Sequence, residues 1–150
     1  MKARTILITG LLTLLVVVLA SCGDPATLAR AAPSTNQGLP VLSKNPAGFM
    51  DLSAKQLAES MTSKNFSLVN VHIPDQEKLP NTDLSIPFNQ ITANLDKLPR
   101  KDAPIVLYCR SGSMSTQAAA ALAAAGYTEI YELHGGFNAW KAAGYAIVNN

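Results

Sequence analysis

Apolar residues come in short blocks over residues 49–150 of this chain, and the spacing of the blocks predicts strands that alternate with helices. Residues 66–71 and 105–108 are apolar runs of strand length, and residues 129–133 form a third. A shorter extended piece covers residues 84–88. Because strands separated by helices are typical of parallel sheets, the pattern predicts an α/β domain.

The helices are predicted from their boundary signals as well as from composition. Ser53, followed three residues later by Gln56, matches a capping box and predicts a helix over residues 54–61. Residues 115–125 contain seven alanines, which predicts a helix that packs close to a sheet and ends at Gly126. Three further predictions are a helical turn at residues 91–98, a helix at 137–143 closed by Gly144, and a loop at 74–83.

The N-terminus has the pattern of an export signal. Lys2 and Arg4 precede an uncharged apolar stretch at residues 6–19, and small residues then lead to Cys22. The ending Leu-Ala-Ser-Cys at residues 19–22 resembles the lipobox of bacterial lipoproteins. The resemblance implies that residues 1–21 are a lipoprotein signal peptide. It also implies that Cys22 carries the lipid and becomes the first residue of the mature chain.

An uncleaved transmembrane helix is the alternative, because residues 5–22 approach the length that spans a bilayer. Both interpretations place the following domain outside the cytoplasm and tethered to a membrane. The expected location is the periplasmic face of the inner or outer membrane, or the cell surface; Gly23, in place of an aspartate, favours the outer membrane. Residues 22–48 are then the lipidated cysteine and a flexible linker, and residues 49–150 the domain.

Charge and cysteine count restrict the function. Removing Lys2 and Arg4 with the signal peptide leaves ten basic and ten acidic residues, so nucleic-acid binding has no electrostatic basis. The chain has two cysteines. If Cys22 is acylated, Cys109 is the one free thiol of the mature chain, and any second thiol must come from an external acceptor.

Cys109 lies where the predicted strand 105–108 gives way to the alanine-rich helix. The N–H groups and dipole of the helix favour a thiolate there, so Cys109 is expected to ionise more readily than a free cysteine. Gly112 permits a turn in which backbone N–H groups converge on an anion. The predicted anion-binding residues are Arg110, Ser111, Gly112, Ser113, Met114 and Ser115.

Two structural alternatives apply to this segment. The alternative interpretation of Cys109 is a buried core residue, although a core position does not need the Arg-Ser-Gly turn that follows it. The alternative interpretation of Ser111 and Ser113 is that they cap the helix. The histidines, His72 and His134, are separated in sequence from cysteine and acid clusters, so no metal site is predicted.

Three segments together resemble single-domain rhodanese-like sulfurtransferases over roughly residues 49–148. They are the strand end at residues 68–74, the Cys-Arg-Ser-Gly loop at 109–112, and the Gly-Gly-Phe-Asn-Ala-Trp segment at 135–140. The resemblance implies an α/β fold with a mostly parallel central sheet and helices on both faces. It also implies that a Cys109 thiolate takes the outer sulfur of thiosulfate or of a persulfide donor. The sulfur is held as a persulfide and passed to a thiol or cyanide, with no cofactor and no metal.

The sequence departs from the family pattern at two places. Met114 stands where the family usually has a basic residue that helps to hold an anionic donor. Asn70 and His72 replace the acidic and basic residues of an Asp-Val-Arg segment, which removes an expected structural charge pair. A binding module of low activity, or a redox sensor that oxidises Cys109, therefore remains an alternative. A phosphatase of the same fold would need an arginine where Ser115 stands.

Overall fold

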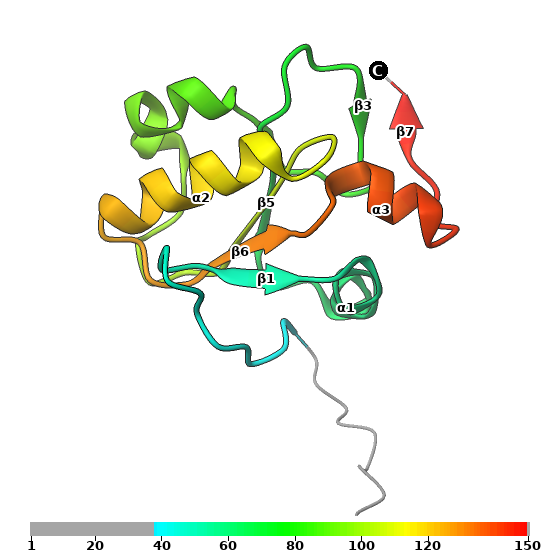
Figure 1. The fold of residues 1–150 in the computed structure, drawn as a ribbon, viewed down its shortest axis with the longest axis horizontal. Coiled ribbons are helices and arrows are strands. Elements are labelled where there is room, and N and C mark those ends of the chain that lie inside the picture. Colours follow the sequence, from blue (N-terminus) through cyan, green and yellow to red (C-terminus); the bar gives the residue numbers. More distant parts are fainter. Residues whose placement is uncertain (1–37, 150) are drawn as a thin grey trace, which may run out of the picture. The chain divides into compact units, whose positions relative to one another are not determined.

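A computed structural model describes residues 38–149 of the chain, and a five-stranded parallel sheet forms its centre (Figure 1). The strand order is β1-β6-β5-β2-β4. These strands are β1 (Met50–Leu52), β2 (Ser67–Asn70), β4 (Leu84–Ser85), β5 (Ile105–Tyr108) and β6 (Ile130–Leu133). A separate antiparallel pair joins β3 (Glu77–Lys78) to β7 (Val148–Asn149). The predicted α/β class with a mostly parallel sheet is confirmed.

Helices cover both faces of the sheet, as the family resemblance implies. Side chains of α2 (Ser113–Ala124) and of the 3₁₀ segment η2 (Phe88–Lys97) pack on one face. Side chains of α1 (Ala54–Ser60) and α3 (Gly136–Ala142) pack on the other. The short 3₁₀ turn η1 (Met61–Ser63) continues α1. Figure 1 shows α2 and α1 on opposite sides of the strands.

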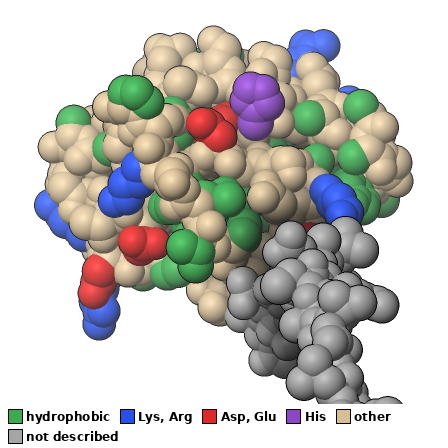
Figure 2. All heavy atoms as spheres, turned by 60° about the horizontal axis from the view of Figure 1, so that its bottom comes forward, with side chains coloured by type: hydrophobic (Ala, Val, Ile, Leu, Met, Phe, Trp, Pro, Cys, Tyr) green, Lys and Arg blue, Asp and Glu red, His purple; other side chains and the backbone are tan. Residues whose placement is uncertain are grey.

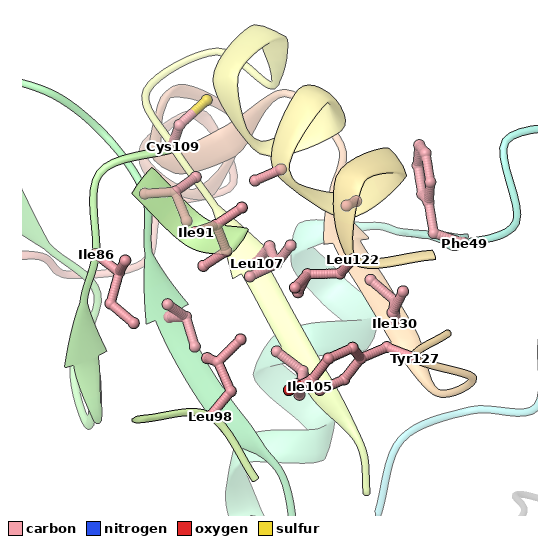
Figure 3. Packing of buried hydrophobic residues seen from close by; sticks show 14 residues of the cluster. Phe49, Ile86, Ile91, Leu98, Ile105, Leu107, Cys109, Leu122, Tyr127 and Ile130 are labelled. Atoms are coloured by element: carbon pink, nitrogen blue, oxygen red, sulfur yellow. The ribbon is translucent and has the colours of Figure 1, made fainter. Parts of the chain in front are cut away.

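Strand β5 illustrates how the sequence fills both layers. Ile105 and Leu107 point toward α2 and η2, whereas Val106 and Tyr108 belong to the cluster under α1 and α3. All four are fully buried, as expected for a central parallel strand covered on both faces. Figure 3 shows the α2 side of this packing, with Cys109 at the end of the strand.

The predicted boundary signals act as expected at two helices. The Ser53 hydroxyl accepts a hydrogen bond from the Gln56 N–H at 3.3 Å, and the Gln56 side chain accepts one from the Ser53 N–H at 2.9 Å. This confirms the capping box. Helix α2 begins two residues before its predicted start, because Gly112 forms the N-cap in a left-handed conformation. Gly126, at φ +88°, follows its last turn as predicted.

Short segments at the domain's periphery differ from the prediction. Strand β1 was not predicted, and the predicted loop at residues 74–83 contains β3. The packed domain also begins before the predicted linker ends at residue 48. Leu39 and Leu42 pack against the α1–α3 cluster, and the Tyr131 hydroxyl donates to the Pro40 carbonyl oxygen at 3.3 Å. These segments are held by distant partners and therefore carry little local pattern.

The predicted signal peptide at residues 1–21, the lipidation site Cys22 and the first part of the linker lie outside the described residues. Within residues 38–149 no helix is both long and apolar enough to cross a bilayer. On the face drawn in Figure 2, basic and acidic side chains are dispersed and no large basic patch gathers.

Candidate active site

Cys109 lies at the carboxyl end of β5, where the chain turns into α2. The Gly112 N–H donates a hydrogen bond to its Sγ at 3.2 Å. Figure 3 shows the sulfur pointing away from the aliphatic side chains of the core and toward the loop before α2. An anionic sulfur at this position is stabilised by the Gly112 amide and by the N-terminal end of the α2 dipole.

The loop is anchored at its start by helix α3. The Phe137 N–H donates to the Cys109 carbonyl oxygen at 2.9 Å, and the Asn138 N–H donates to that of Arg110 at 3.0 Å. This close approach requires glycine at position 136, because a Cβ built there would overlap with the Cys109 carbonyl oxygen. The Gly-Gly segment singled out in the sequence thus positions the cysteine loop from the opposite face of the sheet.

Ser115 connects the sulfur to a buried acid. Its side chain is fully buried, and its Oγ lies 3.3 Å from Cys109 Sγ and 3.0 Å from the Gly112 carbonyl oxygen. The same Oγ lies 2.5 Å from Oε1 of Glu132. Of the six predicted anion-binding residues, Gly112 and Ser115 are therefore the two with hydrogen bonds to the sulfur in the described structure.

Glu132, in the centre of β6, was missed by the sequence analysis. It is 1 % exposed, and burial raises the pKa of its carboxyl above the usual value, against the opposing effect of the Ser115 hydrogen bond. The sequence assigns it to a strand but gives no sign that it faces the cysteine. Its position inside a predicted buried strand, next to the Gly-Gly segment, could have indicated a buried acid, but not which group that acid faces.

The remaining predicted loop residues lie at the surface or in the core. Arg110, Ser111 and Ser113 are exposed. Neither serine caps α2, since no side chain caps that helix and Gly112 occupies the N-cap. Met114 is half-buried and packs against the α2 side of the core.

Cys109 itself is only 1 % exposed and belongs to the α2-side core cluster. The sequence left open whether Cys109 is a reactive thiol or a buried core cysteine, and the structure combines features of both. The sulfur has polar partners suited to an anion, yet it is covered.

The segment that departs from the family pattern has a structural role. The Asn70 side chain donates to Asp75 at 2.9 Å and accepts a hydrogen bond from the His72 backbone N–H at 3.0 Å. Nδ1 of His72 is buried without a hydrogen-bond partner, so this histidine does not replace the missing charge pair. Burial and the nearby Arg110 charge lower the pKa of His72.

Acids in the predicted loop at residues 74–83 bind neighbouring groups in the structure. The Asp83 carboxylate accepts hydrogen bonds from the Leu68 N–H at 2.7 Å and from Lys64 at 2.5 Å. Glu77 pairs with Lys141 at 3.0 Å. These contacts tie the segment between β2 and η2 to the rest of the domain.

Asp51, Glu132 and His134 each place one ligand-type atom within 4.8 Å of the others. The fold thus brings His134 close to two acids, although the sequence analysis treated it as isolated. Asp51 and His134 are exposed, whereas Glu132 is buried with an oxygen held by Ser115. Nothing else in the described residues points to an ion, and we assign no metal to this group.

Comparison with known proteins agrees with this geometry. Residues 50–143 match the rhodanese-like domain family. A sulfurtransferase of Allochromatium vinosum is 32 % identical over 102 residues, covering 65 % of this chain and 94 % of that protein. The thiosulfate sulfurtransferase GlpE of Shewanella oneidensis is 31 % identical over 100 residues, covering 65 % and 97 %. A crystal structure of a rhodanese-related protein from Thermoplasma volcanium superposes with a TM-score of 0.58 at 25 % identity, covering 65 % and 96 %.

Proposed function

The chain belongs to the rhodanese-like domain family, and from this we propose that it is a membrane-anchored, extracytoplasmic sulfurtransferase that carries a sulfane sulfur on Cys109. The observation that carries the proposal is the position of Sγ, at the N-terminus of α2 and 3.2 Å from the Gly112 amide. The relatives named as sulfurtransferases match this chain over nearly their whole length, which supports the sulfur-transfer part of the proposal.

The proposed reaction has two displacements at sulfur. The Cys109 thiolate attacks the outer sulfur of thiosulfate or of a persulfide; the sulfur–sulfur bond of the donor breaks, and sulfite or a thiolate leaves with the electron pair. The terminal sulfur of the resulting persulfide carries the negative charge, which the Gly112 amide and the α2 dipole stabilise. An acceptor thiolate or cyanide then attacks that sulfur and releases the Cys109 thiolate.

The location is supported by the sequence alone. Cleavage before Cys22 and acylation of its thiol would hold the domain at a membrane surface. We expect labelled palmitate to be incorporated into the full-length chain, and Cys22→Ser to abolish the label and release the domain from membranes. A Cys22→Ser chain that stays membrane-bound at its full length would support the uncleaved transmembrane helix instead.

Sulfur transfer can be tested by weighing the intact protein. We expect the full-length chain, incubated with thiosulfate or with glutathione persulfide, to gain the mass of one sulfur atom that cyanide removes. Cys109→Ser should show no gain, and Thr116→Ala, an exposed position of α2 outside the predicted anion-binding residues, serves as a control. A chain that gains no sulfur from either donor would contradict the proposal.

The choice of donor depends on position 114. Thiosulfate carries two negative charges, and Met114 offers none of the compensating positive charge that the family usually places there. We expect Met114→Arg to raise the rate with thiosulfate about tenfold or more, and the rate with an uncharged persulfide much less, because only the former gains a charge-assisted hydrogen bond. Equal changes for both donors would contradict this role.

The second candidate is a rhodanese-fold module with little turnover, which binds a partner or responds to oxidants through Cys109. The observation that favours it is the 1 % exposure of Cys109, together with the apolar Met114 beside it. A chain without sulfur gain that still forms a reversible adduct with hydrogen peroxide at Cys109 would support this alternative.

A further inference from the structure

The sulfurtransferase reaction described above makes no use of Glu132, although this is the one acid with a fully enclosed side chain among the described residues. It lies in β6 between β1 and β5, and its carboxyl points to the α2 side. A buried carboxyl is costly unless it is hydrogen-bonded or remains protonated. In the described structure its carboxyl is hydrogen-bonded to the Ser115 hydroxyl, which also contacts the Cys109 sulfur.

The Ser115 hydroxyl has a single proton but three neighbours. Its Oγ is 2.5 Å from Glu132 Oε1, 3.0 Å from the Gly112 carbonyl oxygen and 3.3 Å from Cys109 Sγ. A separation of 2.5 Å is typical of a strong, charge-assisted O–H···O bond. Therefore Ser115 donates to one neighbour at a time, and its lone pairs are free to accept from another.

Two protonation patterns satisfy this geometry. With Glu132 ionised, the Ser115 O–H donates to Glu132 and the Cys109 S–H donates to Ser115 Oγ. With Cys109 ionised, the Glu132 O–H donates to Ser115 Oγ and the Ser115 O–H donates to Sγ. Both patterns carry one negative charge. A state with both groups ionised places two anions on either side of one hydroxyl in a buried region, which is unfavourable.

The two charged groups near Glu132 have opposing effects on its carboxyl. Asp51 on β1 opposes Glu132 in the sheet register and favours its protonated form, whereas His134, just after β6, favours the ionised form. The α2 side contributes Ser115, and the β5 side contributes Cys109. Burial remains the largest influence and raises the pKa of Glu132.

We propose that Glu132 and Cys109 share one proton through the Ser115 hydroxyl, so that Cys109 becomes a thiolate when Glu132 becomes a neutral acid. In this step the thiol S–H bond breaks and its proton joins Ser115 Oγ. The original Ser115 proton moves to Glu132 Oε1, and the net charge is unchanged. Glu132 is a positioning residue, because it acts on the sulfur through Ser115.

The inference rests on the proposed sulfurtransferase function for its biological use. An anionic donor approaches a loop that lacks the usual basic residue at position 114. A carboxylate beneath the sulfur would add to the repulsion, and protonation of Glu132 removes that charge when the thiolate forms. The relay thus supplies the nucleophile without placing a second negative charge in the site.

The test is a titration of the full-length chain without any sulfur donor. Thiolate formation at Cys109 is followed by ultraviolet absorbance, with the Cys109→Ser signal subtracted. We expect Glu132→Gln to lower the pH of half-ionisation of the thiol by about one unit or more, because glutamine removes the carboxylate that competes with the thiolate for the single negative charge of the pair. Ser115→Ala should shift it in the opposite direction, because the thiolate loses its hydroxyl donor. Glu129→Gln, an acid just before β6 that does not contact Ser115, is the matched control and should cause no shift.

A reciprocal measurement does not depend on whether Glu132→Gln folds. The infrared carbonyl band of the protonated Glu132 acid should persist to higher pH in the wild-type chain than in Cys109→Ser by about one unit or more, because the variant cannot form the neighbouring anion. Loss of the band at the same pH in both chains would overturn the proposal. An unchanged or raised half-ionisation pH in a folded Glu132→Gln chain would overturn it as well.

These outcomes are separate from sulfur transfer. A chain that gains no sulfur but shows both shifts would keep the proton relay and refute the sulfurtransferase function. A chain that gains sulfur but shows neither shift would support the sulfurtransferase function and refute the proton relay.

Discussion

The face of the sheet under α2 differs from the face under α1 and α3 in the size of the side chains that it buries. Helix α2 packs through small residues, among them Ala118 and Ala119, both fully buried. The opposite face is filled by large side chains such as Phe137 and Trp140. The small residues let α2 approach the sheet closely, so that one short hydroxyl, Ser115, connects the sulfur with Glu132.

The comparison suggests a division of roles. The face under α1 and α3 buries the larger aromatic side chains, and burial of such side chains contributes strongly to stability. The face under α2 brings the Cys109 sulfur and the buried Glu132 together through the Ser115 hydroxyl. The two meet where the first turn of α3 donates hydrogen bonds to the start of the cysteine loop.

The largest expected effect on stability comes from Trp140. The side chain is 4 % exposed, its indole N–H donates to the Ala146 carbonyl oxygen at 2.8 Å, and its ring lies 4.6 Å from that of Tyr145. Trp140→Ala should lower the free energy of unfolding by about 3–5 kcal/mol, measured by denaturant titration. The thiol titration of the folded variant should stay unchanged, because Trp140 lies on the face opposite Ser115. Trp140→Phe, which keeps a ring, should lose less. A shifted thiol titration in folded Trp140→Ala would show that the two faces are not independent.

A substitution at Gly136 tests the contact between the first turn of α3 and the cysteine loop, where the two faces meet. Gly136→Ala places a Cβ against the Cys109 carbonyl oxygen, and we expect a loss of about 1–3 kcal/mol together with a strong loss of sulfur loading. Gly144→Ala is the matched control. Gly144 also has a positive φ, +84°, but no atom lies within 4 Å of the position of its Cβ. Equal stability and equal loading in the two variants would contradict the positioning role of Gly136.

The smallest effect is expected at His72, at the edge of the face under α3. Its ring meets that of Phe137 edge-on at 5.5 Å, and burial, with Arg110, lowers its pKa. A lowered pKa means that the folded state resists protonation. The stability that neutral His72 contributes is therefore present above pH 6.5 and is lost as the pH falls through the lowered value. His72→Asn does not titrate in this range, so its unfolding free energy should fall less on acidification. Parallel curves for both chains would exclude this contribution.

Local signals in the sequence determined much of the domain. The apolar runs of β2, β5 and β6, the capping box at Ser53 and the glycine after α2 each act over a few neighbouring residues, so they predict structure without knowledge of the fold. The same locality identified Cys109 as the residue between a strand and a helix, and Gly112 as its turn residue.

The tertiary structure alone decided which groups meet the sulfur. Glu132 is separated from Ser115 by 17 positions and from Cys109 by more, and an acid in a strand gives no local indication of whether it faces water or a thiol. The burial of Cys109, the pairing of β3 with β7, and the proximity of Asp51 to His134 likewise depend on segments distant in sequence. The physical reason is that hydrogen bonds and exclusion of water between such segments arise only when the whole sheet assembles, whereas helix caps and apolar periodicity act within a few residues.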